Sequence, residues 1–124
     1  MSAAKKPQNP VHKVHTSERL FQAQVIQLAK LNGWMVFHPR KMQTQDGRWL
    51  TAVQGDAGFP DLVFAHPGGR GIIYAELKAD RGKLTDLQKH WTSALKINGA
   101  EIYTWWPNDI DAIAKRLAGG RDGR

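Results

Sequence analysis

Apolar residues recur at helical spacing after residue 17. Eight positions form one broad face, namely Leu20, Phe21, Ala23, Val25, Ile26, Leu28, Ala29 and Leu31. Thr16 or Ser17 can cap the start of a helix, and Gly33 is a typical C-terminal stop. The pattern predicts a helix from about Glu18 to Asn32, with Glu18 in its first turn.

The pattern changes from helical to extended after this glycine. Residues 34–38 form a short β-prone run that ends at Pro39, which predicts a strand buried on at least one face. Residues 40–60 show no regular pattern and contain three glycines. A connection of that length is too long for a featureless loop in a compact domain, so we expect it to be functional.

Two apolar runs at residues 61–65 and 71–78 flank a turn rich in glycine and proline, which predicts a β-hairpin. In the second strand, a period of two places Ile72, Tyr74, Glu76 and Lys78 on one face and Ile73, Ala75 and Leu77 on the other. Glu76 and Lys78 are therefore predicted neighbours. Asp61 begins the first strand, and the hairpin can return Glu76 close to it.

The last third of the chain predicts a helix, a strand and a second helix. Thr85 and Gln88 have capping-box spacing and open a helix to about Asn98. Leu87, Trp91, Ala94 and Leu95 lie on one face of this predicted helix. A strand over 101–106 and a helix from Asn108 or Asp109 to Leu117 complete the order αβββαβα. We expect one α/β domain with a mixed central sheet flanked by helices.

Composition narrows the class of protein. The 124 residues are 41% hydrophobic, enough for one compact core, and the absence of cysteine excludes a disulfide framework, a thiol nucleophile and a zinc-thiolate site. There is no apolar run long enough to span a bilayer and no signal-peptide pattern. We expect a cytoplasmic, intracellular protein without a membrane partner.

The net charge of +7 is concentrated in the two ends of the sequence. Residues 1–15 and 115–124 contribute +3 each, whereas residues 16–114 contribute only +1. Such a balance favours a polyanionic partner, nucleic acid first, although basic tails also serve solubility. We expect a disordered basic arm at 1–15, a folded domain at 16–118 and a basic tail at 119–124.

The candidate chemistry lies in Asp61, Glu76 and Lys78. Two carboxylates beside an ammonium suit Mg²⁺, which prefers hard oxygen ligands and can activate a water near a phosphate. Lys78 could orient that water or stabilise negative charge on the phosphate. Alternatively, Glu76 and Lys78 form a solvated salt bridge on an open sheet face, and Pro-Asp is an ordinary dipeptide at a strand start. The pattern alone favours neither interpretation.

Five stretches, two of which contain Asp61, Glu76 and Lys78, form a longer pattern over residues 17 to about 117. They are Ser17-Glu18 with Gln22 and Gln24, Gly55-Asp-Ala-Gly58-Phe-Pro60-Asp61-Leu, Ala75-Glu76-Leu-Lys78, Gly82-Lys-Leu-Thr85 with Gln88 and Trp91, and Gly99-Ala-Glu-Ile-Tyr with Trp106-Pro107. With them the chain resembles the virus-type replication-repair nuclease (VRR-NUC) family of the PD-(D/E)xK nuclease superfamily. No catalytic position departs from the family pattern.

The resemblance implies a restriction-endonuclease-like αβββαβ core and cleavage of DNA that depends on Mg²⁺, with Mn²⁺ as a substitute and no small-molecule cofactor. It implies metal ligands at Asp61, Glu76 and the Leu77 carbonyl, and a role for Glu18 near or at the metal. Stand-alone members resemble homodimeric resolvases of four-way DNA (Holliday) junctions. The implied partners are therefore branched DNA and a second copy of the chain.

Several residues could support such a site. Gln22 and Gln88 could bind metal waters or phosphate, although Gln88 also fits the capping box. Candidate DNA contacts are Arg40, Lys41, Arg48, Trp49, Arg81 and Lys83. His38, His66 and His90 are scattered along the sequence, and we assign them no role. The other tryptophans are expected in the core.

Two other functions fit the same residues. A basic nucleic-acid-binding module could have this fold without turnover, and a nuclease could cut RNA, or DNA without junction preference. Metal-dependent cutting would distinguish a nuclease from a binding module without turnover. A comparison of cleavage rates on junction, flap and linear DNA would distinguish a junction-specific nuclease from one without junction preference.

Overall fold

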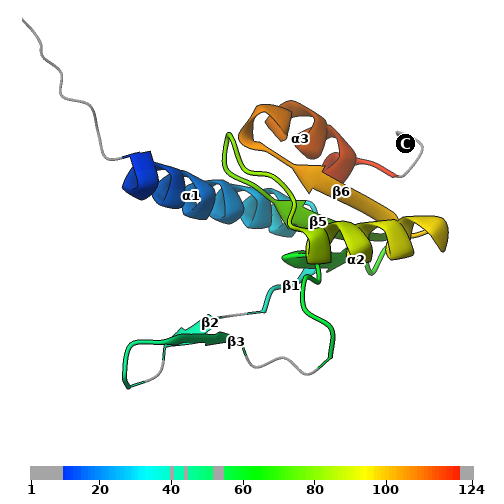
Figure 1. The fold of residues 1–124 in the computed structure, drawn as a ribbon. Coiled ribbons are helices and arrows are strands. Elements are labelled where there is room, and N and C mark those ends of the chain that lie inside the picture. The colour runs from blue at the N-terminus through cyan, green and yellow to red at the C-terminus, as the bar shows by residue number, and fades with distance from the viewer. Residues whose placement is uncertain (1–9, 40, 44, 52–54, 121–124) are drawn as a thin grey trace, which may run out of the picture.

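The computed structural model describes residues 10–39, 41–43, 45–51 and 55–120. Its elements in chain order are α1 (Pro10–Leu31), β1 (Met35–Phe37), β2 (Lys41–Gln43), β3 (Trp49–Thr51), β4 (Leu62–Ala65), β5 (Ile72–Leu77), α2 (Asp86–Ile97), β6 (Glu101–Trp105), the short 3-10 helix η1 (Pro107–Asp109) and α3 (Ile110–Ala118). Helices α1 and α3 lie close together, and α2 lies beside β6 (Figure 1).

A four-stranded mixed sheet with the order β1-β4-β5-β6 forms the centre of the molecule. β4 is antiparallel to both β1 and β5, and Leu62 pairs with Ala75 in the hairpin. β6 runs parallel to β5, with Glu76 opposite Thr104. The predicted hairpin and the predicted mixed sheet are both confirmed.

The hydrophobic core lies between one face of this sheet, α1 and α3. Alternation along β5 turns Ile73, Ala75 and Leu77 into the core, and these are the residues that the sequence predicted to share a face. The other buried members are Phe21, Val25, Ala29, Trp34, Leu62, Phe64, Trp105, Ile113 and Leu117. Trp34 also donates its indole N–H to the Leu117 carbonyl at 2.8 Å, which ties the end of α1 to α3.

Helix α1 begins eight residues earlier than predicted. It starts at Pro10 rather than Glu18, so Glu18 lies about two turns inside the helix. Proline is favoured in a first helical turn, but only Val11 and Val14 are apolar between it and Glu18, too few to show a periodicity. Residues 10–15 of the predicted disordered arm are helical in the structure, and residues 1–9 lie outside the described part of the chain. Among the described helices, none is long and apolar enough to cross a membrane.

The connection over residues 40–60 contains a hairpin that the sequence pattern did not predict. β2 and β3 pair antiparallel, with Met42 opposite Leu50, and form a separate two-stranded sheet (Figure 1). Each strand has only three residues, too few for a period of two to be recognised.

Helix α2 has the predicted start, and its apolar face is only partly covered. The capping box of Thr85 and Gln88 is present. None of the residues of α2, all of which the structure describes, is buried, and Leu87 is 56% exposed. Trp91, which was expected in the core, is half-buried, because periodicity identifies an apolar stripe but not what covers it.

Strand β1 leaves a second apolar surface uncovered. Met35 and Phe37 are 63% and 61% exposed, on the face of the sheet opposite to α1 and α3. The register aligns Met35 with Ala65 and Ala65 with Ile72, which is also mostly exposed. We name Met35, Phe37 and Ile72 the β1 strip. The prediction of a strand buried on at least one face is confirmed, because Trp34 is buried and Val36 is half-buried against the core.

A buried ion pair holds the start of β6, at Glu101, to helix α3. Arg116 of α3 donates to both carboxylate oxygens of Glu101, and the Tyr103 hydroxyl donates to Glu101 at 2.6 Å. Burial and this hydrogen bond raise the pKa of Tyr103 above its ordinary value. Arg116 belongs to the folded core, so it should not be counted with the basic tail as a cation for nucleic acid.

Candidate active site

The β4–β5 hairpin brings the predicted acids together at one end of the sheet. Asp61 directly precedes β4, Glu76 and Leu77 end β5, and Lys78 follows. The Leu77 amide donates to Asp61 Oδ2 at 2.9 Å, so the side chain of Asp61 is fixed across the hairpin. This is the convergence that the sequence predicted.

Glu76 is a buried carboxyl group, only 3% exposed. Its Oε2 atom accepts from the Gln88 amide at 2.7 Å and lies 3.9 Å from the Lys78 ammonium. Its Oε1 atom is buried and has no hydrogen-bond partner among the described residues. A buried carboxylate oxygen without a partner is unfavourable unless a further ligand, such as a cation, completes it.

Burial and the charge of Asp61 shift the pKa of Glu76. Burial, and after it the negative charge of Asp61, raise the pKa of Glu76 from 4.5 to about 8, against the smaller opposing effect of Lys78. The upward shift favours the protonated form of Glu76 in the metal-free protein. Two carboxyl groups can lie side by side in this way until a cation replaces the proton.

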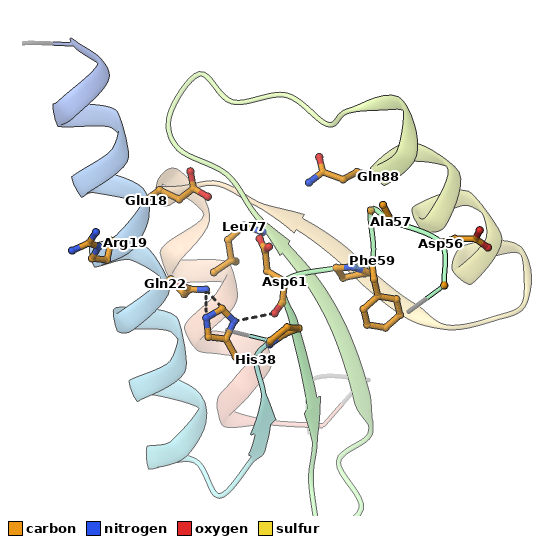
Figure 2. Close-up of a pocket in the computed structure, with 14 residues that line it drawn as sticks. Glu18, Arg19, Gln22, His38, Asp56, Ala57, Phe59, Asp61, Leu77 and Gln88 are labelled. Carbon is orange, nitrogen blue, oxygen red and sulfur yellow. Dashed lines mark hydrogen bonds between the residues drawn. The ribbon is translucent and has the colours of Figure 1, made fainter. Parts of the chain in front are cut away.

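A cavity of about 630 Å³ opens in front of Asp61. Helix α1 lines one side, the loop 55–60 lines another, and Leu77 and Gln88 complete it. Figure 2 shows Glu18 and Gln22 on α1 and Gln88 on α2 around Asp61. The cavity therefore collects the predicted residues from three separate parts of the sequence.

Glu18 lines this cavity from an exposed position on α1. Within the described residues, no group of three Asp, Glu, His or Cys side chains is close enough to hold a metal ion together. Glu18 thus shares the cavity with Asp61 without joining the carboxylate pair. The set of directly clustered donors is Asp61 and Glu76.

His38 is a cavity residue to which the sequence analysis gave no role. Its Nδ1 atom lies 3.2 Å from the Asp61 carbonyl oxygen and its Nε2 atom 3.2 Å from the Gln22 amide nitrogen (Figure 2). A carbonyl oxygen only accepts, so Nδ1 carries the proton and Nε2 accepts from Gln22. The available signal was its place at the end of a strand predicted to join the sheet.

Gln88 has its predicted role in the capping box and a second contact, to Glu76, that the sequence did not predict. Its Oε1 atom accepts from the Thr85 amide at 2.9 Å within the capping box, and its Nε2 atom donates to Glu76. The first turn of α2 is thereby tied to the buried carboxyl group. Both roles are possible because the amide has a donor end and an acceptor end.

Gly58 sets how closely the loop 55–60 approaches α2. Its φ is +96°, and a Cβ atom there would lie 2.6 Å from the Leu87 carbonyl carbon. Gly55 in the same loop has a φ of +106° with no atom within 4 Å of such a Cβ. Of the two glycines in this loop, only Gly58 combines the left-handed conformation with a close backbone contact.

Replacing Gly58 by Ala should lower the unfolding free energy by about 2 kcal/mol, because the added methyl group strains φ and pushes the loop from α2. Gly55→Ala strains φ alone and is the matched control. Chemical denaturation of the two variants measures the difference. Equal losses would contradict the close packing of Gly58 on Leu87.

Three of the predicted DNA contacts have side chains that the structure describes, namely Arg48, Arg81 and Lys83, and none of the three lines the cavity. Arg48 is exposed and pairs with Asp46 at 3.1 Å, and Arg81 and Lys83 are exposed in the turn after β5. Arg40 and the side chains of Lys41 and Trp49 lie outside the described part of the chain. These assignments remain predictions.

Two of the remaining aromatic groups have structural partners. His66 interacts with the Asn32 carbonyl at 2.9 Å and contacts the Trp34 ring edge-on. Trp106 donates to the Gly82 carbonyl at 2.9 Å, which holds the turn after β5. Both contacts hold parts of the fold together.

The donor set fits a small divalent cation. Asp61 and Glu76 are hard oxygen donors, and Glu76 Oε1 is buried without a partner among the described residues. Lys78 is 15% exposed beside them and supplies a fixed positive charge. The arrangement can bind a cation and an anionic group together.

Comparison with known proteins agrees with this architecture. A solved structure described as a VRR_NUC domain matches with a TM-score of 0.56 and 22% sequence identity, covering 78% of this chain and 92% of that chain. Neither a protein-family model nor a curated protein matches the sequence. The predicted αβββαβ core is confirmed, formed by α1, β1, β4, β5, α2 and β6. The chain has the fold of a VRR-NUC domain.

Proposed function

We propose that this chain is a metal-dependent nuclease that hydrolyses phosphodiester bonds in DNA. The observation that carries the proposal is the pair of Asp61 and Glu76, in which a buried Glu76 oxygen has no hydrogen-bond partner among the described residues. A structural ion pair would satisfy that oxygen, whereas a metal site leaves it for the ion. The fold of a VRR-NUC domain supports the same conclusion.

Asp61, Glu76 and the Leu77 carbonyl are the proposed ligands of Mg²⁺, with Mn²⁺ as a substitute. When bound, the ion supplies a water of lowered pKa and offsets charge on the phosphate. Leu77 fixes Asp61 through its amide, and Gln88 fixes Glu76. Glu18 is proposed to act through a water, since it lines the cavity outside the carboxylate pair.

Lys78 is the proposed electrostatic partner of the phosphate. Its ammonium is 15% exposed and 3.9 Å from Glu76, so it is held near the carboxylate pair and only partly screened by water. There it orients the attacking water or stabilises the additional negative charge that develops on the phosphate.

His38 is proposed to hold Asp61 in place through the backbone. His38→Ala should lower cleavage about tenfold by removing one hydrogen bond to the Asp61 carbonyl. His38→Asn retains a donor near the Nδ1 position and should restore most activity, whereas His38→Gln places its amide near Nε2 and should not. Cleavage rates of the three variants test this, and equal losses would exclude positioning through Nδ1.

The proposed substrate is branched DNA, cut by a homodimer in the manner of a four-way-junction resolvase. Two symmetric cuts need two active sites, which a two-fold dimer provides. The β1 strip supports a second copy, because exposed apolar side chains on an edge strand and the adjacent sheet face favour association. The strip lies on the face of the sheet opposite to α1.

Phe37→Glu should convert the proposed dimer into a monomer, because it places a charge in the β1 strip. Sedimentation should show half the mass, and paired cuts in a four-way junction should become single cuts. Leu31→Glu is the control, since Leu31 is 75% exposed but lies on α1, at the opposite face. A wild-type chain that sediments as a monomer while resolving junctions contradicts the dimer.

The function itself is tested by incubating the protein with labelled four-way junction, flap and linear duplex DNA in Mg²⁺, Mn²⁺ or EDTA. We expect cutting with either metal, none in EDTA, and the highest rate on the junction. Binding without cutting in every condition would leave a nucleic-acid-binding module. Equal rates on all three substrates would remove the junction preference.

A further inference from the structure

A second, smaller pocket of about 260 Å³ lies between α2 and the loop 55–60. It is lined by Asp56, Ala57, Leu87, His90, Trp91 and Ala94. Three of these, Leu87, Trp91 and Ala94, belong to the apolar face that the sequence predicted for this helix. The structure leaves this face at the surface, where Leu87 is more than half exposed.

The pocket adjoins the proposed catalytic cavity. Asp56 and Ala57 line both. On α2, Gln88 contacts the buried Glu76 while the preceding residue, Leu87, lines the second pocket. The pocket is therefore placed where a nucleotide next to a phosphate at the catalytic pair could reach it.

The aromatic wall of the pocket is fixed in place. The Trp91 indole N–H donates to the Asp56 carbonyl at 3.2 Å. Phe59 meets the Trp91 ring edge-on at 4.9 Å between centroids and the Tyr74 ring at 6.0 Å. The close approach of Gly58 to Leu87 holds the loop against the helix. A rigid aromatic surface binds a planar ligand at little conformational cost.

The chemistry of the lining selects the part of a nucleotide that would enter. Trp91, Leu87 and Ala94 offer aromatic and apolar contacts, while His90 and Asp56 can bond to the polar edge of a heterocycle. The Asp56 carboxylate repels a phosphate. The volume is below the roughly 300–1,000 Å³ that encloses a drug-sized ligand, and so suits a single base.

We propose that this pocket binds one unpaired nucleobase of the cleaved strand, next to the phosphate at Asp61 and Glu76. The inference rests on the proposed nuclease function and adds a specificity site to it. A base in a continuous duplex must leave its stack to enter the pocket, whereas one at a junction or flap is already free or weakly stacked. The pocket therefore favours branched DNA over linear duplex.

The test uses a four-way junction with a single 2-aminopurine, moved nucleotide by nucleotide across the mapped cleavage point. Ca²⁺ replaces Mg²⁺ in the fluorescence measurement so that the DNA stays intact, and cleavage is measured in parallel in Mg²⁺. On binding, we expect the fluorescence to fall at least about twofold at one position, where the base stacks on Trp91.

Ala94→Leu fills the pocket from an exposed helix position, and Ser93→Leu places the same side chain on α2 outside the lining. Ala94→Leu should abolish the quenching and weaken junction binding about tenfold, whereas Ser93→Leu should change neither. Trp91→Phe, which retains an aromatic wall, should keep part of the quenching.

The outcomes separate this inference from the function on which it rests. Cleavage by the wild type without quenching at any position overturns the nucleobase site alone. Absence of cleavage in Mg²⁺ overturns the proposed function and the site with it. If Ala94→Leu instead lowers the mass in sedimentation, a second copy of the chain covers the pocket, and the nucleobase site is wrong.

Discussion

Replacing Asp61 by Asn should lower the rate of DNA cleavage by at least about a thousandfold. The asparagine oxygen can still accept from the Leu77 amide, so the hairpin is retained. What is lost is one negative charge and one strong metal ligand. Single-turnover cleavage of a labelled junction measures the rate, and a binding assay in EDTA should show nearly unchanged affinity.

Asp80→Asn is the matched control for this loss of charge. Asp80 is an exposed acid two residues beyond Lys78. Its replacement should leave cleavage within a few-fold of the wild type, since an exposed charge is largely screened. If Asp61→Asn cuts as fast as Asp80→Asn, the carboxylate pair is not the active site.

Raising the pH should destabilise the metal-free protein, and Mg²⁺ should reverse the effect. The pKa of Glu76 is raised from 4.5 to about 8 in the folded state. Between these values the folded protein binds a proton that the unfolded chain does not, so folding weakens as the pH rises. The slope from this group is at most about 1.4 kcal/mol per pH unit. Mg²⁺ binds the ionised pair and should stabilise the protein more at about pH 8.5 than at about pH 6.

Glu76→Gln separates this group from the other acids. A neutral side chain of the same size removes the slope and most of the stabilisation by Mg²⁺. Glu18→Gln should keep both, because Glu18 is exposed and outside the carboxylate pair. Thermal unfolding across this pH range, with and without Mg²⁺, provides the readout. An unchanged Mg²⁺ response in Glu76→Gln would place the ion elsewhere.

The sheet could be predicted because its signals are local. Two apolar runs around a turn define β4 and β5, and their register then follows from the short connection. The three-residue strands β2 and β3 carry no such signal. Helix α1 extends back to Pro10 through a segment in which only Val11 and Val14 are apolar, too few to mark a face. Local patterns also could not show that the α2 stripe is uncovered, since that depends on what packs against it.

The site was predictable as far as the hairpin defines it. Asp61 and Glu76 meet because β4 and β5 are neighbours in sequence. His38 comes from another part of the chain, and its place beside Asp61 depends on the antiparallel pairing of β1 with β4. The pocket beside Trp91 needs the loop, the helix and their close contact at Gly58, none of which a linear pattern specifies.

The same geometry relates the charge of the protein to its proposed task. The acids at the catalytic pair and in the loop repel a polyanion, so attraction must come from cations elsewhere. Arg116 is bound to Glu101 and does not serve, whereas Arg81 and Lys83 are exposed beyond β5. A binding face that includes the turn after β5 would place them near the DNA backbone.

The most direct measurement is an anomalous-scattering map from crystals of the wild type soaked in Mn²⁺. The account predicts a Mn²⁺ peak within about 2.3 Å of carboxylate oxygens of both Asp61 and Glu76 and of the Leu77 carbonyl. It also predicts that the peak is absent from Asp61→Asn crystals. Crystals of active protein with no peak at this pair, or with a peak held by other residues, would contradict the central claim.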